Sequence, residues 1–444
     1  MADVAGIPVE DETGVGSYFV ANYPPFSVWT RAAVAEEAMP ALDAAPVPGV
    51  PLGLYLHIPF CRKRCHFCYF RVYTDKNAQE VADYLDVLCR EWTQLAEMPA
   101  LVERPVDFVY FGGGTPSFLS VRQLEGLVRR LTDIRSWTSA EEVTFECEPG
   151  TLTDGKLEAI RALGVTRLSL GVESFDDRLL DINGRAHRSK EIFRAYETAR
   201  ALDFPQINID LIAGMLGETD EGWRESVGRT IALAPDSVTI YQMELPFNTT
   251  ISNDLLSHSG RFAQAPAAWP IKRRWVREAF EALEEAGYHI GSAYTAVRDR
   301  ARTRFVYRDK LWEGADLAGL GVASFGHLNG VHVQNLDQWP TYSDAVRRGE
   351  LAFNRAYRPS RDERLIRELV LQLKRGWIRP AYFRDKYGTD VLERFRGAFS
   401  ALEADGFLDT LTPESVALSR EGLLRVDVLV RRFFLPAHVD VRYT

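Results

Sequence analysis

The sequence predicts an α/β protein whose main part is a partial (β/α)6 barrel of parallel strands. Between residues 53 and 242, short apolar runs alternate with amphipathic helical segments, which is the pattern of buried parallel strands joined by helices. Three cysteines follow the first run, and a glycine-rich turn follows the second. Because the chemistry of parallel barrels gathers at the carboxyl ends of the strands, these two features predict one site at the barrel mouth.

The six expected strands are short runs rich in β-branched and aromatic residues. They are GLYLHI (53–58), VDFVYF (106–111), EVTFEC (142–147), TRLSLG (166–171), QINIDL (206–211) and SVTIYQ (237–242). Helices are expected between them, for example at 78–96, 120–134 and 220–234. Polar residues or glycines end or follow all six strands, which favours a shared site over scattered surface positions.

Three parts are expected: an N-terminal arm and linker (1–50), the barrel (51–300) and a mostly helical C-terminal domain (301–444). In the arm, the aromatic and proline-rich NYPPFSVW (22–29) predicts an extended strap along the body, and AAPVPGVPLG (44–53) reads as a linker. The C-terminal part resembles a winged-helix module, with helices expected at 361–376, 392–408 and 421–434 and a hairpin before the last. DNA binding is the functional reading of such a module. We favour a packing or lid domain, because the chain is acidic and no basic recognition face stands out.

The composition limits the partners that the chain can have. The 444 residues carry a formal net charge of -9, which argues against a broad nucleic-acid surface, since such a surface needs a basic face. No stretch approaches the ~20 apolar residues of a membrane helix. The acidic N-terminus lacks the order of a signal peptide. We therefore expect a cytoplasmic protein with no membrane span and no nucleic-acid partner, which acts on a small molecule.

The cysteines Cys61, Cys65 and Cys68 form the pattern C-x3-C-x2-C. A closed zinc site needs four ligands, and the available histidine, His66, adjoins Cys65 and would have to fold back. A disulfide would leave an odd thiol and would be reduced in the cytoplasm. A [4Fe–4S] cluster held by three thiolates leaves one iron open. That iron can chelate S-adenosylmethionine (SAM), whose reductive cleavage yields a 5′-deoxyadenosyl radical.

Two further features, a glycine-rich turn and a glutamate, fit this chemistry. The two remaining cysteines are not expected to bind the cluster. GGGTP (112–116) follows a strand and would let backbone groups approach the methionine end of the cosubstrate. Glu146 is placed to accept hydrogen bonds from a ribose. We expect Cys89, within a helix, and Cys147, on a strand, to be buried structural thiols.

Motifs along nearly the whole chain resemble those of one family. YLHIPFCRKRCHFCYF, FGGGTPS, FECEPGTL, LSLGVESFDD, INGRAH, INIDLIAGML, GLGVASFGH and LSREGLLRVD are similar to the oxygen-independent coproporphyrinogen III oxidases of the radical SAM superfamily and their relatives. The resemblance implies a [4Fe–4S] cluster on the three cysteines. It also implies SAM as cosubstrate and an electron donor such as flavodoxin or ferredoxin.

The resemblance also implies site residues by position. Contacts to the first SAM fall on Tyr55, Gly113, Glu146 and Phe325. The oxidase binds a second SAM, whose contacts fall on Phe67, Gly114, Thr115, Glu173, Arg185, Asp210 and Met243. Of these, Glu146 and Arg185 are the residues expected to act in catalysis. Arg185 and Asp210 are suited by chemistry to a carboxylate and an ammonium group, and a structural salt bridge between the two is the alternative reading.

Two departures keep the reaction open. True oxidases continue the cluster loop as C-x-C, whereas Cys68 is followed by Tyr69 and Phe70, and the oxidase has glutamine where this chain has Glu173. The C-x-x-C-x-F pattern resembles two other branches: heme chaperones, and class C radical SAM methyltransferases with cyclopropane-forming enzymes. The chaperone branch usually lacks the strap and has H-N-x-x-Y-W where this chain has RFVYRDKLW (304–312).

The expected function is therefore that of a radical SAM enzyme acting on a tetrapyrrole, either as an oxidative decarboxylase in porphyrin biosynthesis or as a heme-modifying methyltransferase. The alternatives are a methyltransferase or cyclopropanase on another unsaturated metabolite, and a heme-binding delivery protein. The arginines expected nearest to porphyrin propionates are Arg62, Arg64, Arg71 and Arg185; a solvated basic loop is the simpler reading of the first three.

Overall fold

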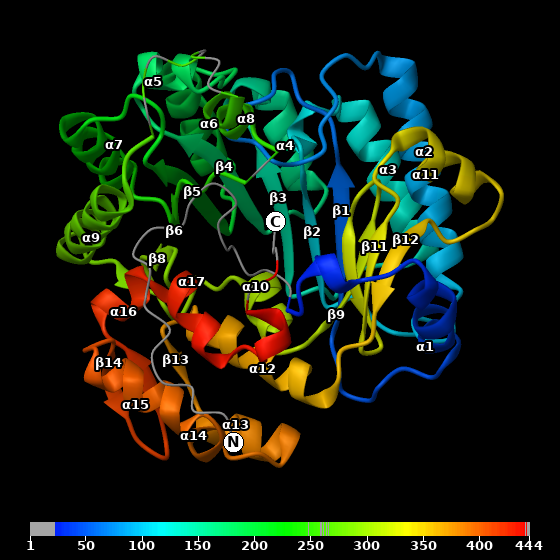
Figure 1. Ribbon diagram of the computed structural model, residues 1–444. Coiled ribbons are helices and arrows are strands. Elements are labelled where there is room, and N and C mark those ends of the chain that lie inside the picture. Colours follow the sequence, from blue (N-terminus) through cyan, green and yellow to red (C-terminus); the bar gives the residue numbers. More distant parts are fainter. Residues whose placement is uncertain are drawn as a thin grey trace.

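The computed structural model describes residues 23–246, 248–257, 260, 262, 264, 266–439 and 441. Within them, one sheet has twelve strands in the order β12-β11-β10-β9-β1-β2-β3-β4-β5-β6-β8-β7. Its centre is the predicted set of six parallel strands (Figure 1). These are β1 (Leu52–Ile58), β2 (Phe108–Gly113), β3 (Glu142–Cys147), β4 (Arg167–Glu173), β5 (Gln206–Ala213) and β6 (Ser237–Gln242).

Helices connect the parallel strands, as the alternating pattern predicts. They are α2 (Ala78–Ala96), α3 (Val121–Ile134), α4 (Asp154–Ala162), α5 (Asp177–Ile182), α6 (Ser189–Ala201) and α7 (Asp220–Leu233), followed after β6 by α8 (Thr250–Ser257) and α9 (Trp269–Glu285). In α2, the Asn77 side chain accepts hydrogen bonds from the backbone of Gln79 and Glu80, which fixes the first turn. Leu88 and Trp92, on the buried face of α2, are fully covered. Local capping and burial thus agree on this helix.

The sheet continues past the expected boundary at residue 300. β9 (Asp316–Leu320) lies parallel beside β1, and an antiparallel set of β10 (Phe325–Leu328), β11 (Val331–Asn335) and β12 (Phe353–Tyr357) extends that edge. At the other edge β8 (Thr295–Val297) and β7 (His289–Ile290) follow β6. The connections contain α10 (Val306–Trp312) and α11 (Trp339–Arg347). These edge strands are short, so their alternation is too brief to be recognised in the sequence.

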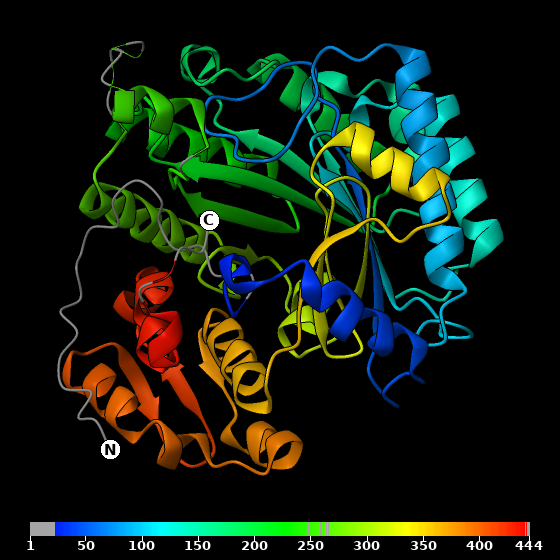
Figure 2. The same cartoon turned by 45° about the vertical axis from the view of Figure 1, so that its right-hand side comes forward.

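The mostly helical C-terminal part begins at α12. It contains α12 (Arg361–Leu373), β13 (Trp377–Ile378), α13 (Pro380–Tyr387), α14 (Val391–Arg394), α15 (Arg396–Ala404), β14 (Leu408–Leu411), β15 (Val416–Leu418), α16 (Arg420–Leu424) and α17 (Val426–Leu429). The expected hairpin is present as β14 and β15. The helices expected at 392–408 and 421–434 are each interrupted. In Figures 1 and 2 this part lies below the sheet, toward the end where β1 begins.

The described part of the N-terminal arm packs on the body. Tyr23 and Trp29 are 0% and 5% exposed, and Thr30 pairs with Ala356 of β12. The arm continues through a π-helix (Val34–Ala38) and α1 (Met39–Asp43). We call residues 23–29 the strap; residues 1–22 lie outside the described residues. The predicted contact between the strap and the body is confirmed for these positions.

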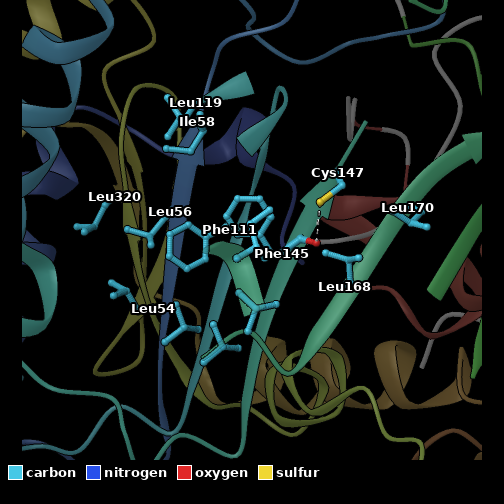
Figure 3. Close-up of a cluster of buried hydrophobic side chains, with 14 of the residues drawn as sticks. Leu54, Leu56, Ile58, Phe111, Leu119, Phe145, Cys147, Leu168, Leu170 and Leu320 are labelled. Atoms are coloured by element: carbon cyan, nitrogen blue, oxygen red, sulfur yellow. Dashed lines mark hydrogen bonds between the residues drawn. The ribbon is translucent and has the colours of Figure 1, made fainter. Parts of the chain in front are cut away.

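The main apolar core is formed by alternate residues of neighbouring strands, on the face of the sheet that the helices cover. Figure 3 shows Leu54 and Leu56 of β1 beside Phe111 of β2 and Phe145 of β3. Cys147 lies in the same cluster, where its thiol points to the Phe145 carbonyl, and it is 5% exposed. Cys89 is 3% exposed, so both cysteines are the buried structural thiols that were expected.

Candidate active site

The three cysteines lie on one loop that leaves the carboxyl end of β1. The stem of the loop is closed by Tyr73, whose backbone N–H donates to Pro59 and whose carbonyl accepts from Cys61. Farther along, His66 is held from outside the loop: its backbone N–H donates to the Asn183 carbonyl, and its Nδ1 lies 2.9 Å from the Ile182 carbonyl. These contacts fix His66 against the end of α5.

Cys61, Cys65 and Cys68 are free thiols, each partly exposed. Among the described residues, no three His, Cys, Asp or Glu side chains are gathered closely enough to hold one metal ion. In a [4Fe–4S] cluster each thiolate binds a different iron, so separate thiols on one loop suit this group. Burial raises the pKa of the Cys61 thiol to about 11 and that of the Cys68 thiol to about 12. Cluster binding would therefore release protons from both.

The glycine turn after β2 lies against the stem of the cysteine loop. The Gly114 N–H donates to the Ile58 carbonyl at 2.9 Å, and a Cβ on Gly114 would lie 2.9 Å from that oxygen and 3.0 Å from the Phe60 nitrogen. Gly113 adopts a φ of +108°, which L-residues avoid. Beside them, Thr115 Oγ1 lies 3.3 Å from Cys61 Sγ. Glycines are required here because two backbone segments meet.

Glu146 of β3 reaches toward the same turn. The Tyr110 hydroxyl donates to Glu146 Oε1 at 2.6 Å, and a Cβ on Gly112 would lie 3.1 Å from Glu146 Oε2. Burial, reinforced by the nearby Asp210, raises the pKa of Glu146 to about 7, although the hydrogen bond from Tyr110 opposes this shift. The carboxyl is thus poised between its acid and base forms, and only glycine at position 112 leaves its Oε2 oxygen uncrowded.

Glu173 and Arg185 form a buried pair that extends to the cluster loop. Arg185 Nη2 lies 3.5 Å from Glu173 Oε1, while Nη1 donates to Cys65 Sγ at 3.3 Å. Glu173, the last residue of β4, has a φ of +65°, an unfavourable conformation that the surrounding structure must hold. Burial raises the pKa of Glu173 to about 7. Arg185 therefore connects a predicted cluster ligand with a predicted SAM contact.

Asp210 is held by polar neighbours, whereas Phe67 and Met243 lie in an apolar cluster. Asp210 accepts from Ser169 Oγ at 2.9 Å and from Asn208 Nδ2 at 2.8 Å. Arg185 pairs with Glu173, so the alternative reading of a salt bridge between Arg185 and Asp210 is wrong. Phe67 packs against a small apolar cluster that contains Met243. These two residues form an apolar wall beside the cysteine loop.

Tyr55 and Phe325 are brought together by the pairing of β9 with β1. Tyr55 is in register with Gly319, and a Cβ on Gly319 would lie 2.1 Å from the Phe325 carbonyl oxygen. The Phe325 ring contacts the strap at Phe26 and Trp29, with ring centroids 6.1 and 5.7 Å apart. The strap therefore lies next to the predicted position of the first SAM.

Two tyrosines inside the barrel, Tyr110 and Tyr307, were not among the predicted site residues. The ring of Tyr110 lies 4.3 Å from that of Tyr307 and 6.0 Å from that of Tyr55. Tyr110 lies on the same face of β2 as Phe108 and Gly112, at a spacing of two residues, and this pattern could have indicated its inward direction. Tyr307 lies in the segment where this chain departs from the H-N-x-x-Y-W motif, and only the fold brings it to Tyr110. These rings surround Glu146 with an aromatic wall.

The four arginines considered for propionate binding already have protein partners. Arg62 pairs with Glu148 at 3.0 Å and Arg71 with Asp337 at 3.4 Å. Arg64 donates to the carbonyls of Cys68 and Asn248, and Arg185 is engaged as described above. Carboxylates of a substrate would have to displace or share these contacts.

The fold and the residues at the carboxyl ends of the parallel strands indicate the class of protein. Residues 55–229 match the model of the radical SAM superfamily. This stretch contains the three cysteines, the glycine turn and the carboxylates of β3, β4 and β5, and the match implies a [4Fe–4S] cluster and SAM. The chain therefore contains a radical SAM domain, and it resembles the coproporphyrinogen oxidase-like proteins.

Particular relatives cover most of the chain. The heme chaperone HemW of Bacillus subtilis is 26% identical over 373 residues, 83% of this chain and 96% of its own length. The oxygen-independent coproporphyrinogen III oxidase of Synechocystis is 26% identical over 414 residues, 88% of this chain and 86% of its own. The structure of coproporphyrinogen III oxidase from Escherichia coli, a radical SAM enzyme, covers 94% of this chain with a TM-score of 0.79 and 24% identity. It confirms the predicted fold.

Among the described residues, no helix combines the length and the apolar character needed to cross a bilayer.

Proposed function

We propose that this protein is a radical SAM enzyme that acts on a tetrapyrrole, with its cluster on Cys61, Cys65 and Cys68. The observation that carries the proposal is the convergence of the cysteine loop, the glycine turn, Glu146 and the Arg185–Glu173 pair at one barrel mouth. When bound, the cluster would supply the electron that cleaves SAM to a 5′-deoxyadenosyl radical.

The chain's own residues would bind and orient the cosubstrate. Glu146, in its ionised form, would accept hydrogen bonds from a ribose, with Tyr110 fixing one of its oxygens. The turn at Gly113 and Gly114 would leave space for the methionine end. The tyrosine rings around Glu146 would exclude water, which a reactive carbon-centred species requires.

Glu173 and Arg185 would bind a second SAM if the chain takes two. Arg185 is suited to a carboxylate and Glu173 to an ammonium group, and Phe67 and Met243 would cover its apolar side. Arg185 and Glu173 would give up their contact with each other and would contact the second SAM instead. An electron donor such as flavodoxin or ferredoxin would reduce the cluster.

A heme-binding delivery protein is the second candidate. It is supported by the relatives named heme chaperone and by the C-x-x-C-x-F pattern of the loop. The two candidate functions differ in their products. An enzyme consumes SAM and changes its substrate, whereas a delivery protein returns heme unchanged. The methyltransferase reading differs again, since it releases S-adenosylhomocysteine.

Product mass spectrometry distinguishes these functions. The cluster is reconstituted without oxygen, and SAM, a reductant and coproporphyrinogen III are added. Loss of two carboxyl groups from the porphyrinogen together with 5′-deoxyadenosine supports the decarboxylase. Untouched porphyrinogen with abundant 5′-deoxyadenosine and S-adenosylhomocysteine supports a methyl-transferring enzyme on another substrate. Stoichiometric heme binding without either product supports the delivery protein.

A further inference from the structure

A cavity of about 400 Å³ lies where β4 and β6 begin, at the opposite strand ends from the cysteine loop. Its walls come from these strand starts, from β7 and β8, from the segment between β8 and α10, and from the turn before β13. Five arginines line it: Arg167, Arg300, Arg304, Arg308 and Arg375. This concentration of positive charge is unusual in a chain whose formal net charge is -9.

Two of the five guanidinium groups are neutralised by carboxylates. Arg308 pairs with its neighbour Asp309 at 2.7 Å, and Arg375 pairs with Glu313 at 2.7 Å. Asp309 is the one carboxylate among the lining residues that the structure describes. The other three arginines make no hydrogen bond or ion pair through their side chains with any described residue. Among the lining residues the arginines therefore outnumber the carboxylates, and two of them, Arg300 and Arg304, are exposed to solvent.

Arg167 is the most informative of the three because it is buried. It is 2% exposed, and its guanidinium lies over the Phe305 ring at 4.1 Å. Glu142, a buried carboxylate in the same region, accepts hydrogen bonds from the backbone of Val306 and Tyr307 and from Thr144. The charge of Arg167 opposes the rise in the pKa of Glu142 and Asp210 that burial causes, so these two carboxyls balance part of its charge. A largely buried guanidinium still gains from hydrogen-bond acceptors, and an anion in the cavity would supply them.

The remaining lining is partly apolar, and Ser237, Thr295 and Thr303 contribute hydroxyl groups to it. Trp377 is 42% exposed and lines the cavity with Phe305, Ile290 and Val297. Aromatic walls with a few convergent charged groups are typical of pockets for small organic ligands, which span about 300–1,000 Å³. Guanidinium groups match the planar geometry of carboxylates and the oxygens of phosphates.

We propose that this cavity binds a small organic anion that joins a flat ring to carboxylate or phosphate groups. The ring would lie between Phe305 and Trp377, and the acidic groups would face Arg167, Arg300 and Arg304. The concave shape and the burial of Arg167 favour a small molecule over a protein surface. The proposal does not depend on which reaction the opposite end of the barrel performs.

Isothermal titration calorimetry on the full chain with its cluster reconstituted tests this proposal at constant ionic strength. Benzene-1,3,5-tricarboxylate probes for carboxylates and phenyl phosphate for phosphate, so the stronger binder identifies the anionic group. We expect saturable one-to-one binding of at least one probe. Because hydrogen bonds to charged groups are strong, the Arg300→Gln/Arg304→Gln double variant should weaken it about tenfold or more.

Arg302→Gln is the matched control, since Arg302 is exposed on the same segment but does not line the cavity. It should leave the affinity unchanged, and both proteins should keep the visible absorbance of the cluster. Three results would overturn the proposal: no saturable binding of either probe, equal binding by the double variant, or equal weakening by Arg302→Gln, which would indicate a general effect of charge.

Discussion

Arg185 donates a hydrogen bond to the thiol of Cys65, and its other terminal nitrogen faces Glu173. One guanidinium therefore spans from the predicted cluster loop to the end of β4. Its loss would affect two neighbours at once: the thiol would lose a donor, and a buried carboxyl would lose its counter-charge.

We expect Arg185→Met to destabilise the fold by about 3 kcal/mol at pH 8, because removing one partner of a buried pair leaves the other charged and unpaired. The effect should be smaller at pH 6, since burial raises the pKa of Glu173 to about 7 and the carboxyl then takes up a proton. Urea unfolding at both pH values measures this. Adding Glu173→Gln should restore part of the loss. Arg188→Met removes an exposed pair with Asp181 and should cost less than about 1 kcal/mol.

Alanine at Cys61, Cys65 or Cys68 should each abolish the cluster absorbance at about 410 nm. The control is Cys147→Ala, which removes a buried thiol of the barrel core and should keep the absorbance. Iron and sulfide analysis after anaerobic reconstitution gives the same comparison. A loop variant that retains a full complement of iron would not be a ligand.

SAM affinity should rise with pH if Glu146 accepts hydrogen bonds from the cosubstrate. With its pKa raised to about 7 by burial, the ionised fraction grows about tenfold between pH 6 and pH 8. Tyr110→Phe removes a hydrogen bond that lowers this pKa, so the midpoint should move upward. Equilibrium binding of SAM to the reconstituted protein checks both. A pH profile that stays the same in Glu146→Gln would remove Glu146 from this role.

Gly114→Ala should displace the stem of the cysteine loop, because the added Cβ would meet backbone atoms of Ile58 and Phe60 that cannot rotate away. We expect less iron per chain after reconstitution. Gly126→Ala is the matched control, since no atom lies within 4 Å of its added Cβ within α3. It should raise stability by about 0.5–1 kcal/mol and leave the iron content unchanged.

Acid should weaken the attachment of the strap. His332 stacks on Trp29 with ring centroids 5.0 Å apart, and its Nε2 lies 3.2 Å from the Tyr23 carbonyl. Burial lowers the pKa of His332 well below its usual value, with Arg367 contributing. The folded chain therefore binds fewer protons than the unfolded chain below pH 6.5.

From this one group, the free energy of unfolding should fall by about 1.4 kcal/mol per pH unit below 6.5. His332→Phe keeps a ring beside Trp29 and should reduce this slope, while the neighbouring His327, also buried and shifted in the same direction, still contributes. Urea unfolding from pH 7 to pH 5 provides the comparison. Equal slopes in both proteins would show that His332 does not titrate on unfolding.

The sequence predicts the six central strands well because each is a continuous apolar run that only a buried parallel strand explains. β3 and β6 agree residue for residue with the expected 142–147 and 237–242. The edge strands β7 to β12 were not recognised, since each is five residues or fewer and pairs through contacts distant in sequence. The helices expected at 392–408 and 421–434 were read as continuous because apolar periodicity persists across their breaks.

For the site, local motifs predict the cysteine loop and the glycine turn, and the structure brings these two together. The contact of Arg185 with Cys65 depends on a separation of 120 residues, and no local pattern indicates it. The same is true of the cavity around Arg167, whose arginines come from separate segments. Such a cluster of arginines can be recognised only from the folded structure, which brings the amino ends of these strands together.

The burial of Tyr23 has a consequence for the order in which the chain matures. Its ring lies 4.9 Å from that of Phe434, and its hydroxyl accepts from the Leu435 backbone at 2.9 Å. During synthesis, Tyr23 therefore has no complete burial site until Phe434 and Leu435 have left the ribosome. The two segments, 412 residues apart, must meet before the strap is fully packed.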